Sequence, residues 1–117
     1  MRFNELGAPV EKMSKPGEVR IFFDRRELTL ILGVYGRMVA AGEWRDYALD
    51  SLQDRCVFSV FRRASETPLY RIEKQPALAR KQGAFSVVAQ QGQILRRGHE
   101  LSAVLRVFEK GRFAVVD

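Results

Sequence analysis

The spacing of the apolar residues changes at Gly42, and this change restricts the chain to folds that combine a helix with a sheet. Before Gly42, apolar residues recur at helical spacing, at Leu28, Ile31, Leu32, Tyr35, Met38 and Val39. After it, apolar and polar residues alternate as they do in strands. Because 117 residues are enough for one core and too few for two, the sequence predicts one α+β domain over residues 18–117. Residues 1–17 mix charges with glycine and proline, and we expect them to form a mobile leader.

The helix is expected over residues 25–41. Asp24 has a side chain suited to an N-cap, and Glu27, three residues later, completes a capping box. Inside the helix, Gly33 and Gly36 each cost about 1 kcal/mol relative to alanine. A close approach by the sheet or by a second subunit is one explanation for these glycines, and a tolerated pair is the other.

A short strand is expected before the helix, over residues 19–23, and an antiparallel meander of about five strands after it. The meander strands are expected over residues 47–52, 56–62, 69–73, 84–90 and 93–97. With Val60 opposite Ile72, the residues that share one face are Phe58, Val60, Tyr70 and Ile72. The other face then holds Ser59, Phe61, Arg63, Arg71 and Glu73. We expect the long helix to cover one face of the sheet.

The C-terminal segment from His99 is interpreted as a short helix through Leu101, Val104, Leu105 and Phe108. A strand through Val104 and Arg106 is an alternative, because the segment is short and contains β-branched residues.

Five segments of the sequence resemble a small bacterial family known as a domain of unknown function, number twenty-seven ninety-four in that series. The segments are residues 23–28, 36–47, 57–63, 68–74 and 83–101. The resemblance covers roughly residues 18–108. It implies a bacterial, cytoplasmic, stand-alone domain, and it carries no activity, cofactor or catalytic residue to this chain.

No residue pattern specifies a catalytic or metal site. Cys56 and His99 could form a nucleophile pair if they met in space, but Cys56 opens an apolar strand, where a cysteine usually acts as a small hydrophobe. Asp46, Asp50 and Asp54 are spaced by four residues, which on a helix would align three carboxylates for a hard cation. On a strand, the same spacing separates Asp46 and Asp50 by about 13 Å, so a solvated acidic edge is the expectation.

The sequence indicates no cofactor-binding motif, no membrane-spanning segment and no secretion signal. Glycine-rich phosphate loops and dinucleotide fingerprints are absent, so no cofactor is expected. No apolar run approaches the roughly 18–20 residues that a bilayer requires, and no signal peptide is indicated. The single cysteine fits a reducing compartment, so we expect a cytoplasmic protein.

Positive charge is concentrated in the second half of the chain. Residues 55–112 hold 12 Lys and Arg against 4 Asp and Glu, whereas residues 1–54 hold 8 against 9, and the net charge is +6. The candidate anion-binding residues are Arg62, Arg63, Arg71, Arg80, Lys81, Arg96 and Arg97. If these residues converge, they form a groove able to follow a phosphate backbone, with Phe61 as a stacking platform. Adjacent residues of a strand point to opposite faces, which would disperse the charge. Ion pairs with Glu66, Glu73 and Glu100 would neutralise it.

Three functions remain open from the sequence. The first is a non-enzymatic binding or regulatory module for an anionic partner such as nucleic acid. The second is a protein-interaction module, able to pair with itself, whose candidate interface residues are Gly33, Gly36, Trp44, Arg45 and Tyr47. The third is an enzyme for a small substrate, which would need His99 beside an acid or Cys56.

Overall fold

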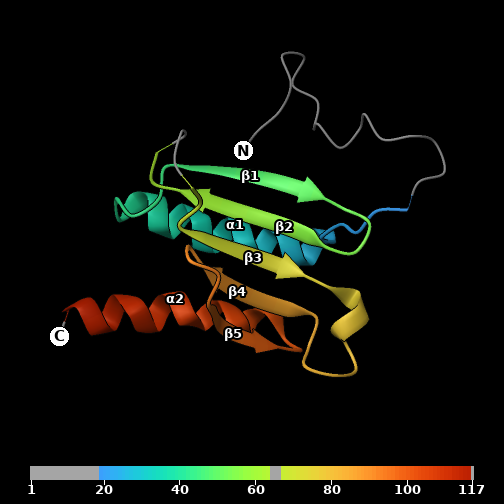
Figure 1. Cartoon of the computed structure of the whole chain (residues 1–117). Helices are drawn as coiled ribbons and strands as arrows, with labels where there is room; N and C mark the ends of the chain where they lie inside the picture. The colour runs from blue at the N-terminus through green and yellow to red at the C-terminus, as the bar shows by residue number, and fades with distance from the viewer. Residues whose placement is uncertain (1–18, 64–66, 117) are drawn as a thin grey trace, which may run out of the picture.

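In a computed structural model, which describes residues 19–63 and 67–116, an antiparallel sheet carries two helices on one face (Figure 1). The elements in chain order are α1 (Arg25–Ala40), β1 (Asp46–Ser51), β2 (Cys56–Phe61), β3 (Tyr70–Lys74), the 3-10 turn η2 (Pro76–Leu78), β4 (Phe85–Ala89), β5 (Ile94–Gly98) and α2 (Leu101–Val116). The strands form one 5-stranded sheet in the order β1-β2-β3-β4-β5. The predicted α+β meander is therefore confirmed, and the expected leader over residues 1–17 lies outside the described residues.

The start of α1 is held by the capping box that the sequence predicted. Asp24 Oδ1 accepts a hydrogen bond from the Glu27 N–H at 2.8 Å, and the Asp24 N–H donates to Glu27 Oε1 at 2.8 Å. Lys74 on β3 reaches the same place, donating from Nζ to Glu27 Oε1 at 2.7 Å and to the Phe22 carbonyl at 2.9 Å. These contacts join the first turn of the helix to the end of a central strand.

The structure corrects two details of the predicted secondary structure and decides between the helix and the strand for the C-terminal segment. Phe58 is opposite Ile72 and Val60 is opposite Tyr70, so the expected register is wrong by two residues. The predicted faces survive this shift, because side chains alternate with a period of two. The expected strand over residues 19–23 is wrong, since this segment joins no ladder within the described residues and only the Ile21 N–H donates to the Leu52 carbonyl. For the C-terminal segment the helix is confirmed, and the strand alternative is wrong.

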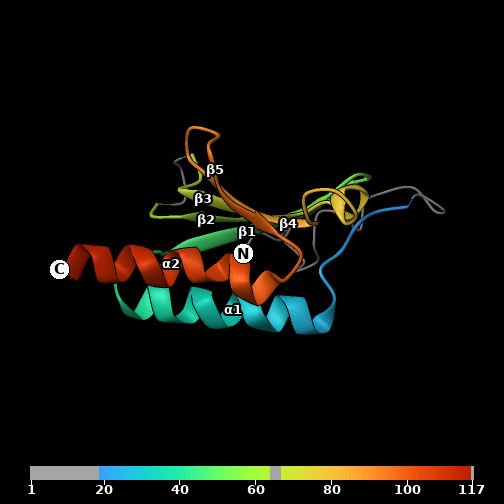
Figure 2. The ribbon, with the colours of Figure 1, turned by 90° about the horizontal axis from the view of Figure 1, so that it is seen from below.

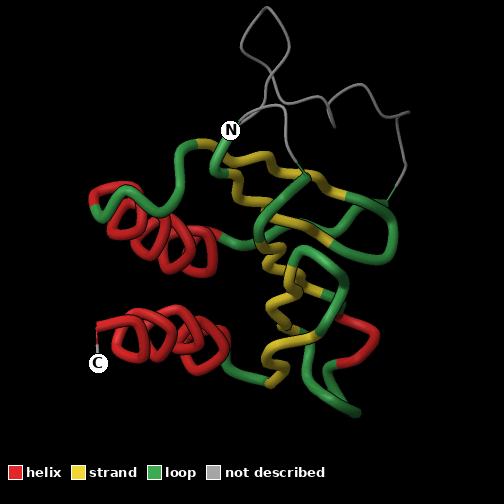
Figure 3. The backbone as a smooth tube through the Cα atoms, turned by 60° about the vertical axis from the view of Figure 1, so that its left-hand side comes forward, coloured by secondary structure: helices red, strands yellow, loops and turns green. Residues whose placement is uncertain are grey.

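The core lies between the helices and the sheet. Figures 2 and 3 show α1 and α2 side by side on the same face, running in the same direction. Ile31 from α1, Phe58 from β2 and Val87 from β4 are fully buried in this layer. Leu101 and Val104 bring the apolar side of α2 against the same cluster. The helical stripe and the alternating strands thus bury their apolar sides against each other.

The opposite face of the sheet is covered by neither of these helices. We call it the open face, and its residues follow from the strand register: Asp46, Ala48, Asp50, Val57, Ser59, Phe61, Arg71, Glu73, Ser86, Val88 and Arg97. Side chains on neighbouring strands that are directly opposite share a face, so charged groups far apart in sequence become neighbours here.

Candidate anion-binding face

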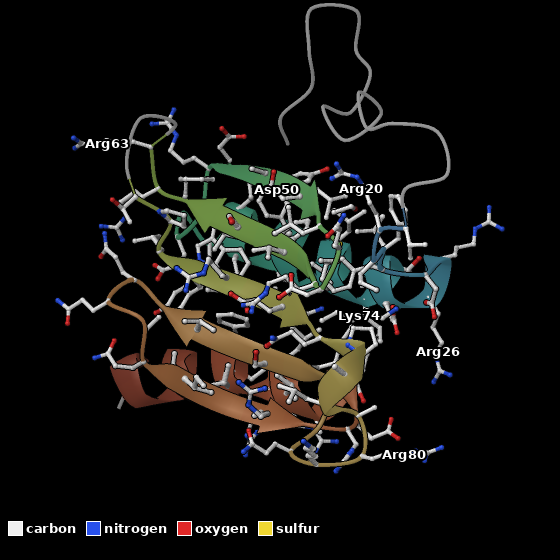
Figure 4. All side chains as sticks on the ribbon, turned by 45° about the vertical axis from the view of Figure 1, so that its right-hand side comes forward. Arg20, Arg26, Asp50, Arg63, Lys74 and Arg80 are labelled. Atoms are coloured by element: carbon white, nitrogen blue, oxygen red, sulfur yellow. The ribbon has the colours of Figure 1, made fainter. Side chains whose placement is uncertain are left out.

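The predicted groove of seven basic residues does not form. Arg62 and Arg63 follow β2, whereas Arg80 and Lys81 lie in the connection between β3 and β4. Successive connections of a meander lie at opposite ends of the sheet, and Figure 4 shows Arg63 and Arg80 at opposite ends of the molecule. The expectation of one continuous surface is therefore wrong.

The doublet of Arg96 and Arg97 is also divided, in the manner that strand geometry predicts. Arg96 points to the helical face, where its Nη1 donates to the Ala103 carbonyl of α2 at 3.0 Å. Arg97 lies on the open face opposite Ser86. Of this pair, only Arg97 contributes to the open face.

Glu73 lies buried on the open face between two arginines. Its Oε1 accepts from Arg55 Nη1 at 2.9 Å and its Oε2 accepts from Arg71 Nε at 3.1 Å. Arg55 also contacts Asp54, and this hydrogen bond raises the pKa of the Arg55 guanidinium. The predicted neutralisation by Glu73 thus holds for Arg71, and sequence reasoning missed Arg55.

Ser86 is the second residue that sequence reasoning missed. Its side chain is 1% exposed, and its Oγ has no hydrogen-bond partner within the described residues. Arg97, directly opposite, has a buried Nη1 that likewise has no acceptor among the residues that the structure describes. No local sequence signal marks Ser86, since its surroundings come from the two flanking strands.

The expected stacking platform is wrong. Phe61 lies on the open face, as predicted, but its side chain is only 4% exposed. Its ring is therefore not offered to a base, and the open face presents polar donors instead.

Comparison with known proteins places the chain in a family. A sequence model described as "Protein of unknown function (DUF2794)" matches residues 21–105. The chain belongs to this family. No curated protein and no solved structure gives a significant match to the chain. The DUF2794 match spans α1, the whole sheet and the start of α2, so the open face belongs to the family domain.

The DUF2794 fold separates the two residues of the hypothetical nucleophile pair. Cys56 is buried on β2, while His99 is exposed just after β5. Three interstrand steps of about 4.8 Å separate these strands, so the two residues are about 14 Å apart or more. The Cys56–His99 pair is therefore wrong. Within the described residues, no group of three or more metal-ligating side chains is placed to hold an ion.

The candidate interface residues of the DUF2794 chain have different environments. Trp44 is 1% exposed and lies in the core, so its assignment to a surface contact is wrong. Tyr47 is half-buried and its ring stacks on Phe58 with centroids 4.5 Å apart, whereas Arg45 is exposed. None of the helices in the described part of the chain combines the length and hydropathy needed to span a bilayer.

Gly33 and Gly36 lie on the exposed side of α1. A Cβ atom at Gly36 would meet nothing within 4 Å, and one at Gly33 would lie 3.9 Å from Arg37 Nη1. The explanation by close approach of the sheet is wrong, and approach by a second subunit stays a prediction.

Replacing Gly36 with alanine is expected to stabilise the monomer by roughly 0.5–1 kcal/mol. The new methyl group enters open space, and alanine loses less conformational entropy on folding than glycine. Denaturant unfolding followed by circular dichroism measures the change. A loss of stability in G36A would mean that something packs against this position.

Proposed function

We propose that this chain is a non-enzymatic binding module that takes an anionic partner, nucleic acid in the first instance, on the open face of its sheet. The supporting observation is the charge around Glu73 on this face. Arg71 and Arg97 lie on the face, and Arg55 reaches Glu73 from the loop before β2. Among the described residues, Glu73 and Asp54 pair with Arg71 and Arg55, which leaves the charge of Arg97 in excess. Asp46 and Asp50 lie on the same face but along β1, at the far edge of the sheet.

The basic connection before β4 extends this positive region. Arg80 and Lys81 are exposed, and Gly83 at the end of their connection lies against Gly98 at the end of β5. Arg97 immediately precedes that contact. The planar guanidinium of arginine suits phosphate geometry better than the point charge of lysine does, and 15 of the 20 basic residues are arginine.

A salt titration tests the proposal. Labelled single-stranded and duplex oligonucleotides are titrated with the full chain, and fluorescence anisotropy gives the affinity at several salt concentrations. Binding is expected to weaken with salt, with a logarithmic slope of about −0.7 for each phosphate contacted on a single strand. Background affinity without a salt slope would reject nucleic acid as the partner.

Two matched variants locate the surface. Ile94, opposite Val88 on the open side of the sheet, is 53% exposed, and Val39 on α1 is 40% exposed. Ile94→Glu and Val39→Glu introduce the same charge at exposed aliphatic positions on opposite sides of the molecule. Only Ile94→Glu is expected to weaken binding, and equal losses in both variants would contradict an open-face site.

A second candidate function is self-association through α1. Leu32, Gly36 and Val39 follow one another at helical spacing on its exposed side, which favours a protein contact. Light scattering across a wide concentration range tests it. A dimer that Val39→Glu dissociates would support this function, and a monomer at every concentration would reject it.

The cellular setting is also a proposal. The family resemblance supports a bacterial source, and the single cysteine supports a cytoplasmic location. Localisation of a tagged full-length chain in cells tests the second point.

A further inference from the structure

Among the described residues of the open face, two buried polar atoms lack hydrogen-bond partners, and they belong to neighbouring residues. Ser86 on β4 and Arg97 on β5 are directly opposite in the register. Their Cβ atoms are therefore about 4.5–5.5 Å apart on the same face. Ser86 Oγ and Arg97 Nη1 are both buried, and neither makes a hydrogen bond within the described residues. Burying donors without acceptors costs free energy, so two such atoms together mark a place where an acceptor would be favourable.

Arg71 adds unused donors from the third strand. Its Nε is taken by Glu73, whereas its two terminal nitrogens donate to no group among the described residues. Arg71 is opposite Val88, which is two residues from Ser86 on the same face of β4. Arg71 and Ser86 are therefore diagonal neighbours about 7–8 Å apart on adjacent strands, within the reach of an arginine side chain. Donors from β3, β4 and β5 thus surround one region of the face.

The nearby carboxylate of Glu73 does not neutralise the positive charge of Arg97. Glu73 is opposite Ser86, but both of its oxygens already accept hydrogen bonds from Arg55 and Arg71. Arg97 makes no ion pair with any described residue. Asp50, in the same row of the face, is four strands away, about 19 Å from Arg97. Among the described residues, the charge of Arg97 therefore stays uncompensated beside the Ser86 hydroxyl.

We propose that Ser86, Arg97 and Arg71 form a subsite for a phosphate group, which rests on the proposed function because it assigns the phosphate contact of the same face. Two guanidinium groups and one hydroxyl supply donors from three strands. A tetrahedral oxyanion offers oxygens in as many directions, whereas a carboxylate offers only two oxygens in one plane. Binding supplies acceptors to Ser86 Oγ and Arg97 Nη1, which have none within the described part of the protein.

Titration with inorganic phosphate tests the subsite directly. Phosphate is added to the full chain against chloride at equal ionic strength, and amide chemical shifts are followed by nuclear magnetic resonance. Shifts are expected at β4 and β5 around Ser86 and Arg97. Ser86→Ala and Arg97→Gln are each expected to weaken phosphate binding about tenfold to a hundredfold, since each removes a hydrogen bond to a charged group. Arg62→Gln, which removes the same charge at the far end of the sheet, serves as the matched control and should bind like the parent.

Thermal unfolding in phosphate-free buffer gives a second, independent measurement. Ser86→Ala is expected to unfold at the same temperature as the parent or higher, because the removed hydroxyl has no described partner. A lower unfolding temperature would show that the hydroxyl is satisfied in the unliganded protein and would overturn the subsite. The unfolding temperature of Ser86→Ala tests the subsite even if the Arg97→Gln variant fails to fold.

The outcomes separate the subsite from the proposed function. Oligonucleotide binding that is unchanged in Ser86→Ala and Arg97→Gln overturns the subsite and leaves the open-face proposal standing. Phosphate shifts that are equal in the parent and in both variants also overturn it, and would identify an adventitious ion only. Loss of phosphate and oligonucleotide affinity together in both variants supports the subsite and assigns it to the backbone of a nucleic acid. Phosphate binding lost in both variants, without oligonucleotide binding in the parent, supports the subsite for a free phosphate and rejects the nucleic-acid partner.

Discussion

Replacing Gly83 with alanine is expected to destabilise the protein by about 2–5 kcal/mol. Gly83 has a φ of 105°, a conformation that costs an L-residue about 1–2 kcal/mol. A Cβ atom built there would lie 2.2 Å from the Gly98 carbonyl carbon and 2.3 Å from its oxygen. Both are backbone atoms in or next to the β4–β5 ladder, so relieving the overlap requires a backbone shift worth about 1–3 kcal/mol more.

Gly92→Ala is the matched control for this experiment. Gly92 also has a positive φ, 95°, but a Cβ atom there would meet nothing within 4 Å. Gly92→Ala is expected to lower the free energy of unfolding by about 1–2 kcal/mol, from the backbone conformation alone. Urea unfolding of both variants measures the difference, which isolates the close approach of the two backbones. Equal losses would contradict a contact between Gly83 and Gly98.

The element types could be predicted from the sequence because each depends on local chemistry. Asp24 and Glu27 are three residues apart, so their reciprocal capping is visible before any tertiary structure exists. The alternation through Phe58 and Val60 likewise assigns the faces of β2 without knowledge of its partners. The exact pairing of Val60 was wrong because register depends on turn geometry and on packing across the sheet, which the alternation alone does not contain.

The candidate site depends on contacts between distant segments, and this is why much of it was not predicted. Arg55 reaches Glu73 across 18 residues of sequence, through a register that no local pattern reveals. Nothing in the local sequence distinguishes Ser86 from other strand serines. Its environment comes from Glu73 and Arg97, which are opposite it on the two flanking strands. Conversely, the charge doublets are conspicuous in sequence, yet the meander sends Arg62 and Arg80 to opposite ends. The charge composition led to the prediction of an anionic partner, but it did not indicate which surface of the fold would bind one.

Trp44→Ala is expected to destabilise the protein by about 3–5 kcal/mol, the usual cost of emptying a large buried aromatic site. Trp44 follows α1 and lies at the junction of both helices and the sheet. Its ring meets Phe108 of α2 edge-on at 4.9 Å, and the rings of Tyr35 and Tyr70 lie at 6.2 and 6.3 Å. Removing it opens a cavity that touches α1, β3 and α2 together, so no single element can move to fill the space.

Urea unfolding followed by far-ultraviolet circular dichroism measures this loss, because Trp44 is the only tryptophan and the variant has no indole fluorescence. Phe22→Ala, at an exposed aromatic, is the control and is expected to change stability by less than about 0.5 kcal/mol. A partner-contact role for Trp44 makes the opposite forecast: a variant as stable as the parent that has lost binding. Because the indole is buried, we expect Trp44→Ala to lower the free energy of unfolding. Any loss of binding is then expected to match the increase in the fraction of unfolded chain.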